Sequence, residues 1–242
     1  TEDFVQAIAD GATSHGELLG FDLELFKRWY YQAGTPELSI ERQWNPESGQ
    51  LTVDLHQATP PTPGQADKQP LVLPVAMALV GEQGRVGDEQ LLVMEAERAS
   101  ITLQGQPGDT PPALSVLRRF SAPVHVRLEQ PLEECLQLLA SDDDSFCRWD
   151  AAQRLARQVL LARAENEPKP AVEAALIQAL DQRICAYDGG DGMGLAALLA
   201  LPGMAELEAL QSLVDPLALD QAFRAWTQEL GVQLQSSLRR LL

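Results

Sequence analysis

A zinc hydrolase needs two histidines one helical turn apart, a third ligand, and a carboxylate that activates water. The chain contains His15, His56 and His125, which are dozens of residues apart. The residues around His15 read S-H-G-E-L, which is not the H-E-x-x-H zinc motif. His125 alternates with valines on a predicted strand and should therefore face solvent. We predict that all three are solvent-facing or locally bonded, and that none is a metal ligand.

The cysteines have no signature of a nucleophile. Cys135, Cys147 and Cys185 form no C-x-x-C pair, and no motif supplies any of them with a base. Cys147 starts a predicted helix, a position that lowers the pKa of a thiol, but a packed structural cysteine is the interpretation we favour. An odd number of separated thiols is typical of a reducing compartment, so we expect the protein to be cytoplasmic.

A glycine cluster at residues 189–194, G-G-D-G-M-G, has the composition of a phosphate-binding loop but not its spacing. G-x-G-x-x-G requires glycine at position 195, which is Leu195, and the cluster follows a predicted helix instead of a strand. We interpret it as a loop that terminates a helix. No G-x-S-x-G nucleophile elbow occurs either, so serine hydrolase chemistry has no support.

The acidic run Asp142, Asp143 and Asp144 could attract calcium, but it lacks the spaced oxygen ligands of an EF-hand loop. Capping is the better interpretation, because a carboxylate accepts the free N–H groups of a helix start and Asp150 can support Arg154 four residues later. The sequence therefore predicts no catalytic residue, no cofactor-binding residue and no metal ligand.

The charge balance excludes one class of partner. The chain of 242 residues has 18 basic and 35 acidic side chains, a formal net charge of −17. Such a field repels phosphate backbones, so we expect no nucleic acid partner.

No stretch approaches the ~18 uninterrupted apolar residues of a membrane span. The N-terminus also lacks the basic, apolar and small-residue regions that follow one another in a signal peptide. We expect a folded protein without a membrane segment; because it lacks an initiator Met, it can also be a piece of something longer.

The positions of the apolar residues predict three regions. Residues 1–35 have helical spacing, are interrupted by G-A-T-S-H-G-E-L-L-G at residues 11–20, and end at Gly34-Thr35-Pro36. In residues 36–130 the period changes to two: a hairpin, a proline-rich loop over residues 59–70 and further short strands predict an antiparallel β-sandwich.

In residues 131–242 the helical period returns. Helices joined by short loops predict an α-α array, although no strict repeat is visible. Trp149 shares a stripe with Ala152 and Ala156, whose small side chains leave room for an indole, so we predict a buried structural anchor. The predicted fold class is thus multidomain β + α, with a short helical segment, an antiparallel β-sandwich and an α-helical, superhelical domain.

Several segments carry a specific resemblance. D-S-F-C-R-W-D-A-A-Q-R-L at residues 144–155 resembles the D-x-F-x-R-W-E/D-A-x-Q-x-L stretch of bacterial aminopeptidase N, a thermolysin-related family that removes N-terminal residues from peptides. F-K-R-W-Y-Y-Q-A-G-T-P-E-L at residues 26–38 is similar to the segment leaving that family's catalytic domain. Residues 57–86, with the proline-rich loop, resemble its β-sandwich, and residues 201–230 resemble its helical domain.

The resemblance implies a fragment of a zinc enzyme. The family's H-E-x-x-H motif, its distant Glu ligand and its G-x-M-E-N loop lie upstream of the matching region and do not occur in this sequence. Zinc, peptide substrates and the catalytic domain would belong to the parent protein, and residues 131–242 would form part of the wall around its active site. Residues 1–35 would then lack their packing partners, so we expect docking onto the sandwich with some self-association. The alternative is an independent interaction module without a protease parent.

Overall fold

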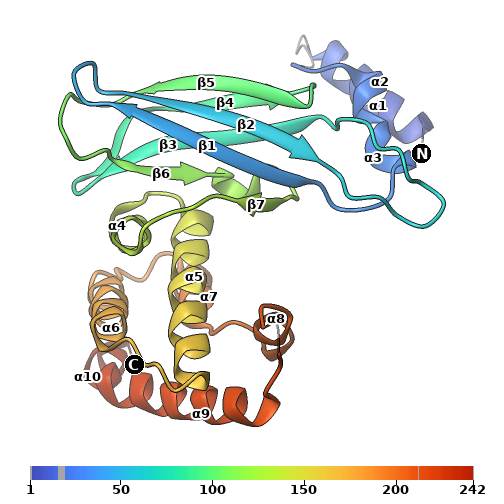
Figure 1. The fold of residues 1–242 in the computed structure, drawn as a ribbon. Coiled ribbons are helices and arrows are strands. Elements are labelled where there is room, and N and C mark those ends of the chain that lie inside the picture. The colour runs from blue at the N-terminus through green and yellow to red at the C-terminus, as the bar shows by residue number, and fades with distance from the viewer. Residues whose placement is uncertain (1, 16–19, 212, 242) are drawn as a thin grey trace. The chain divides into compact units, whose positions relative to one another are not determined.

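The computed structural model forms two compact units, each with its own core. One unit contains residues 1–79 and 86–129, and the other contains residues 80–85 and 130–242 (Figure 1). The structure describes residues 2–15, 20–211 and 213–241. Two sequence features fall partly outside these ranges: the start of the predicted segment 1–35 and the G-E-L-L part of the helix-breaking stretch.

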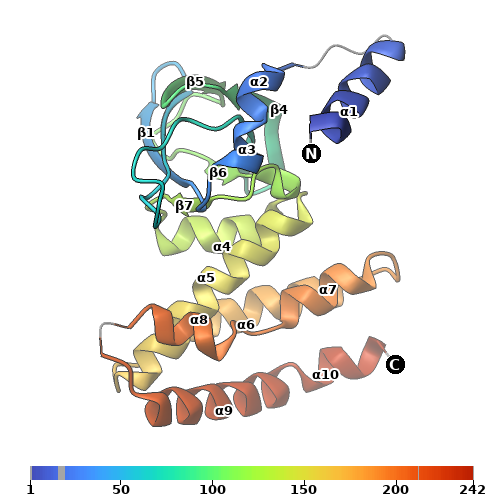
Figure 2. The ribbon, with the colours of Figure 1, turned by 90° about the vertical axis from the view of Figure 1, so that its right-hand side faces the viewer.

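Two sheets form the layers of the sandwich in the first unit (Figures 1 and 2). One sheet has the order β5-β2-β1-β7 and the other has the order β4-β3-β6. The strands are β1 Glu37–Asn45, β2 Gln50–Ala58, β3 Leu73–Gly81, β4 Gly84–Met94, β5 Arg98–Gln104, β6 Ala113–Val116 and β7 His125–Arg127. The β1–β2 hairpin is antiparallel and in register from Glu37↔Ala58 to Asn45↔Gln50.

The strand pattern follows from the sequence, with one difference. Leu51, Val53 and Leu55 of β2 are buried on alternate positions, as period two requires, whereas the continuous apolar run of β3 is buried at nearly every position. Strand β7, however, pairs with β1 in parallel. The chain reaches β7 from β6, which lies in the other sheet, so no tight hairpin imposes an antiparallel direction.

The turn after β6 is strained and ion-paired. Leu117, Arg119 and Phe120 have positive φ values of 57°, 56° and 54°, which L-residues rarely adopt. Arg118, only 2% exposed, donates to Glu89 Oε2 at 2.7 Å, and Arg119 Nη1 donates to the same oxygen at 2.8 Å. These two guanidinium groups lower the pKa of Glu89 to about 2, with Arg119 the larger cause.

The N-terminal segment consists of α1 Glu2–Ser14, α2 Leu23–Phe26 and α3 Arg28–Tyr31. Helix α1 continues through the first residues of the predicted break, because an internal glycine weakens a helix without ending it. Trp29 Nε1 donates to Val72 O at 2.9 Å and Arg28 Nη1 donates to Pro70 O at 2.7 Å. These bonds confirm that the last part of the segment docks on the sandwich unit.

The helical unit is built around α5 (Figure 2). Its helices are α4 Leu132–Ser141, α5 Ser145–Ala164, α6 Pro170–Cys185, α7 Gly192–Leu199, α8 Met204–Ala209, α9 Pro216–Gln233 and α10 Gln235–Leu238. Asp144 caps α5 by accepting from Cys147 N at 2.9 Å, and proline occupies the first turn of α6 and α9. Helix capping by the acidic run is therefore confirmed.

The buried tryptophan of this unit is not the one expected. Ala152 and Ala156 of α5 are buried as predicted, but Trp149 is half-buried, and its ring lies tilted by 39° against that of Phe146 with the centroids 5.6 Å apart. The prediction of a buried Trp149 is wrong: helical spacing places it on the same stripe as Ala152 and Ala156, but spacing does not determine how much of each side chain is covered. The fully buried indole is that of Trp226 on α9, with 0% exposure.

Candidate functional site

Each histidine lies in its own local surroundings. His15 follows α1 and its Nδ1 is 2.8 Å from Gly11 O, while His125 begins β7 with an exposed side chain. His56 on β2 bonds to Glu97, with Nε2 to Oε1 at 3.0 Å. The expected local or solvent-facing histidines are thus confirmed. Within the residues that the structure describes, no three His, Cys, Asp or Glu side chains are grouped so that they could hold a metal ion.

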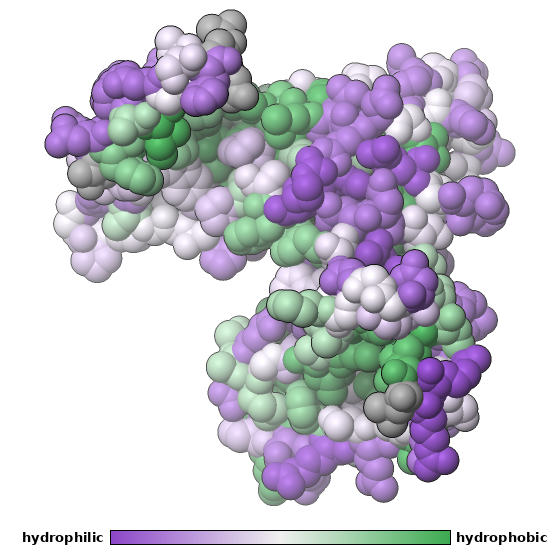
Figure 3. All heavy atoms as spheres, turned by 180° about the vertical axis from the view of Figure 1, so that it is seen from behind, coloured by the Kyte–Doolittle hydropathy of each residue, from purple (hydrophilic) through white to green (hydrophobic). Residues whose placement is uncertain are grey.

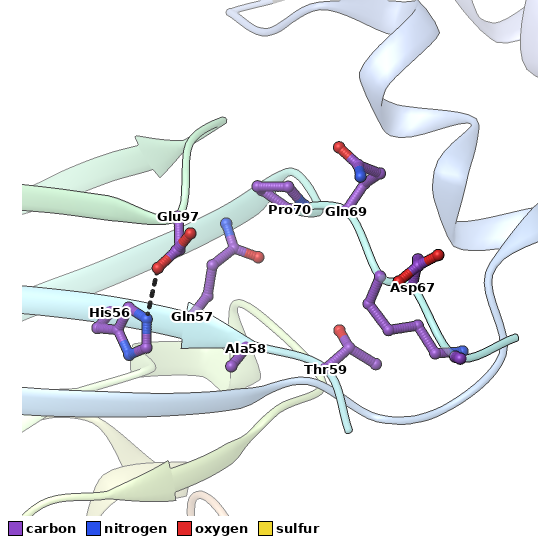
Figure 4. Close-up of a pocket in the computed structure, with 10 residues that line it drawn as sticks. His56, Gln57, Ala58, Thr59, Asp67, Gln69, Pro70 and Glu97 are labelled. Atoms are coloured by element: carbon purple, nitrogen blue, oxygen red, sulfur yellow. Dashed lines mark hydrogen bonds and ion pairs between the residues drawn. The ribbon is translucent and has the colours of Figure 1, made fainter. Parts of the chain in front are cut away.

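His56 and Glu97 open into a polar pocket of about 670 Å³ at the end of β2 (Figure 4). The proline-rich loop lines the rest of it, through Thr59 and residues 66–70. Sequence reasoning missed this pair because 41 residues separate its members. The signal that could have found it is the register of the β2–β5 pairing, in which His56 faces Arg98, the residue after Glu97.

The other polar groups of this pocket are used to hold the loop. Gln57, 3% exposed, donates to Leu71 O at 2.8 Å and accepts from Leu71 N at 2.9 Å. Lys68 Nζ donates to Ala33 O at 2.8 Å and to Thr62 Oγ1 at 2.7 Å. The pocket therefore contains one imidazole–carboxylate pair beside a hydrogen-bonded loop, and no hydroxyl or thiol of the described residues is bonded to the imidazole.

The cysteines have different environments. Cys135 and Cys147 are buried, which confirms the packed position expected for Cys147. Cys185 is exposed at the end of α6, where Arg240 Nη2 lies 2.7 Å from its Sγ. The sequence did not single out this contact, because Arg240 is 55 residues away.

The glycine cluster is a connection between two helices, as predicted. Helix α6 ends at Cys185, and Asp191 Oδ1 accepts from Gly194 N at 2.7 Å, which caps α7. Helix α7 begins at Gly192, so the last three residues of the cluster lie in its first turn and not in the connection. The Asp191 carboxylate thus occupies the helix N-terminus at which a phosphate-binding loop would hold its anion.

Comparison with known domain families confirms the predicted architecture. Residues 34–129 match a domain of unknown function, DUF3458, described as having an Ig-like fold. Residues 132–242 match its companion, DUF3458_C, described as ARM repeats. The chain therefore has an Ig-like β-sandwich followed by a helical domain of the ARM-repeat type.

Curated relatives that match nearly the whole chain are named aminopeptidase N. Over 98% of its length the chain is 32% identical to aminopeptidase N of Escherichia coli (strain K12), and over 93% it is 39% identical to aminopeptidase N of Caulobacter vibrioides (strain ATCC 19089 / CIP 103742 / CB 15). It covers 27% and 26% of these proteins. A crystal structure of Legionella pneumophila aminopeptidase A in complex with aspartic acid has the same fold: the TM-score is 0.75 at 24% identity, over 99% of this chain and 26% of that one.

The sandwich and the helical array thus match a region of proteins named aminopeptidase N. The predicted family is confirmed: the chain is related over nearly all of its length to bacterial aminopeptidase N, and it spans about a quarter of the curated relatives it matches. Among the residues that the structure describes, no helix combines the length and the apolar character that crossing a membrane requires.

Proposed function

We propose that this chain is a non-catalytic scaffold segment of a zinc-dependent aminopeptidase N. The observation that carries the proposal is the match of 98% of the chain to 27% of an aminopeptidase N, in a sequence without H-E-x-x-H. Residues 1–35 are the end of the catalytic domain, residues 36–130 the β-sandwich domain, and residues 131–242 the first part of the helical domain. Zinc, the catalytic groups and the cleavage of peptides belong to the rest of the polypeptide.

The proposed role of the segment is mechanical. The Trp29 bond holds the N-terminal segment on the sandwich, and the Gln57 bond holds the end of the proline-rich loop there. Lys68 joins this loop to Ala33, just after the N-terminal helices. Such a frame supports a catalytic domain on one side, and the helical domain forms part of the wall of the active-site chamber. The cytoplasm is the compartment proposed for the whole enzyme, because the three cysteines are far apart in the sequence and form no C-x-x-C motif.

An independent interaction module is the second candidate. Exposed apolar side chains favour it: Figure 3 shows a hydrophobic area on the lower, helical part, and Leu210, Leu213 and Leu217 are 55%, 87% and 67% exposed. A partner protein would cover such side chains. The remainder of a helical domain would cover them equally well, so they agree with the scaffold proposal too.

Two measurements separate the candidates. The reading frame upstream of the chain should encode H-E-x-x-H, and the isolated chain should contain no stoichiometric zinc and release no aminoacyl chromophore. The protein translated from the whole reading frame should contain zinc and release the chromophore. Replacing the Glu of its H-E-x-x-H should abolish release while zinc is retained. An upstream frame that lacks the motif, or release by the isolated chain, would overturn the proposal.

A further inference from the structure

A second pocket, of about 220 Å³, lies within the helical unit between α5, α6 and α7. Arg148 enters it from the first turn of α5 and Arg183 from the last turn of α6. Figure 2 shows α6 and α7 running beside each other, and both contact α5. The rest of the wall includes Tyr187, Asp188, Asp191, Leu195 and Leu198.

Neither arginine forms an ion pair with a carboxylate of the described residues, although Asp188 and Asp191 lie on the wall of the same pocket. Arg148 Nη1 donates to a neutral acceptor, the carbonyl oxygen of Asp142, at 2.6 Å. The guanidinium of Arg183 has no hydrogen bond or ion pair to any residue that the structure describes. Burial and, second, the positive charge of Arg148 both lower the pKa of Arg183. Two partly buried like charges destabilise each other unless an anion lies between them.

Two other partly buried arginines of the molecule are paired with carboxylates. Arg118 is paired with Glu89 at 2.7 Å, and Arg163 is paired with Glu173 at 2.7 Å. Acidic residues outnumber basic ones 35 to 18, so partners for Arg183 are abundant in composition. Within the described ranges, Arg183 therefore lacks the carboxylate partner that Arg118 and Arg163 each have.

The acidic residues on the wall select the charge of the ligand. Asp188 Oδ1 accepts from Gly190 N at 3.0 Å and Asp191 Oδ1 accepts from Gly194 N at 2.7 Å, so both carboxylates are held by the loop. Their negative charge disfavours a doubly charged phosphate more than a singly charged anion. A guanidinium matches the two oxygens of a carboxylate, and Tyr187 adds a hydroxyl donor to the same wall.

We infer that this pocket binds a small, singly charged organic carboxylate between Arg148 and Arg183. The pocket is smaller than the ~300–1,000 Å³ typical of drug-sized ligands, so it accommodates a free small acid or the terminal carboxylate of a peptide. Leu195 and Leu198 contact the short apolar part of the ligand. This inference is independent of the proposed function, because it depends only on groups in the helical unit.

Acetate is the probe for the test, with neutral acetamide and inorganic phosphate for comparison. Titration of the 242-residue chain, followed by arginine Nε–H shifts in NMR spectra, should show saturable binding of acetate and none of acetamide. Arg183→Gln should weaken acetate binding at least ~10-fold, because a charge-assisted pair is lost. Arg224→Gln removes an exposed charge on α9 and should leave the affinity unchanged.

Stability measurements keep the test valid if binding is weak. Without ligand, Arg183→Gln should melt at the same temperature as the parent or higher, because it removes an uncompensated charge; acetate should raise the melting temperature of the parent only. A tripeptide and its C-terminal amide test whether the carboxylate can be the terminus of a peptide instead of a free small acid. If it can, only the tripeptide with the free terminus competes with acetate. Tighter binding of phosphate than of acetate, or equal acetate binding by Arg183→Gln and the parent, would overturn the inference.

Discussion

The guanidinium carbon of Arg163 lies 4.7 Å from the ring centroid of Trp226, the one described tryptophan with 0% exposure. The same guanidinium donates to Glu173 at 2.8 and 2.7 Å and to Glu229 at 2.7 Å. Arg163 belongs to α5, Glu173 to α6, and the other two to α9. One arginine therefore joins three helices through two ion pairs and a cation–π contact.

Truncating the buried indole should be far more damaging than truncating the half-buried one. Trp226→Ala should lower the free energy of unfolding by about 3–5 kcal/mol, because it leaves a large cavity and removes the contact with Arg163. Trp149→Ala should cost less than half as much. Trp226→Phe is the control that keeps an aromatic face. Urea unfolding followed by circular dichroism measures all three, and equal losses for both alanine variants would contradict this ranking.

Breaking the Glu173–Arg163 ion pair should lower the free energy of unfolding. Glu173 is 7% exposed, so Glu173→Gln leaves Arg163 with one carboxylate instead of two and should destabilise the unit by about 2–3 kcal/mol. Asp220→Asn breaks the exposed Arg224–Asp220 pair, the matched control, and should cost at most about 0.5 kcal/mol. A double-mutant cycle with Arg163→Met should assign most of the Glu173 loss to the pair. A coupling energy near zero would mean that Glu173 acts through packing alone.

Acid should weaken the sandwich unit through Glu89. Its pKa is about 2 in the folded protein, below the ordinary 4.5, so its contribution is complete above pH ~4.5 and is lost as the pH falls towards 2. The contribution amounts to about 2–3 kcal/mol. Glu89→Gln should therefore reduce stability at pH 7 and flatten its decline between pH 4.5 and 2. The test is thermal unfolding of both proteins across that range, and parallel pH profiles would exclude a role for Glu89.

Two glycines of the sandwich unit should respond differently to alanine. Gly49, in the β1–β2 turn, has φ +68°, and a Cβ there would lie 2.5 Å from the carbonyl carbon of Gln106. Gly64 has φ +80° with no heavy atom within 4 Å of the Cβ position. Gly64→Ala should cost about 1 kcal/mol for backbone strain, and Gly49→Ala at least about 2 kcal/mol, since a backbone clash is added. Denaturant midpoints compare them, and equal values would show that the turn moves without cost.

Self-association through residues 1–35 remains a prediction that a surface variant can test. On α1, Phe4 and Ile8 are 62% and 52% exposed one turn apart, while Val5 is buried. Replacing Phe4 and Ile8 by serine should lower the mass measured by light scattering without changing the melting temperature, because neither side chain is part of the core. Leu91→Ser, at a strand position that is 61% exposed, is the control and should not change the mass. An unchanged mass in the double variant would show that α1 is not the contact.

The sequence by itself determined the order of the architecture. Apolar residues repeat with period two in β2 and with helical spacing in α5, and Asp144 caps the helix start, so local geometry alone requires strands in one region and helices in the next. The resemblance of residues 144–155 to aminopeptidase N likewise depends on one contiguous stretch of sequence. These features can be predicted without tertiary information, because each depends on residues that are close together in the sequence.

The tertiary structure decided which distant side chains meet. Arg148 and Arg183 face one pocket only because α5 and α6 pack together, and His56 reaches Glu97 only through the β2–β5 pairing. Periodicity assigned Trp149 to the correct stripe of its helix, but burial also depends on what covers each turn. A periodic pattern identifies the face of an element and not the partner opposite it, since the partner is chosen by packing of the whole chain.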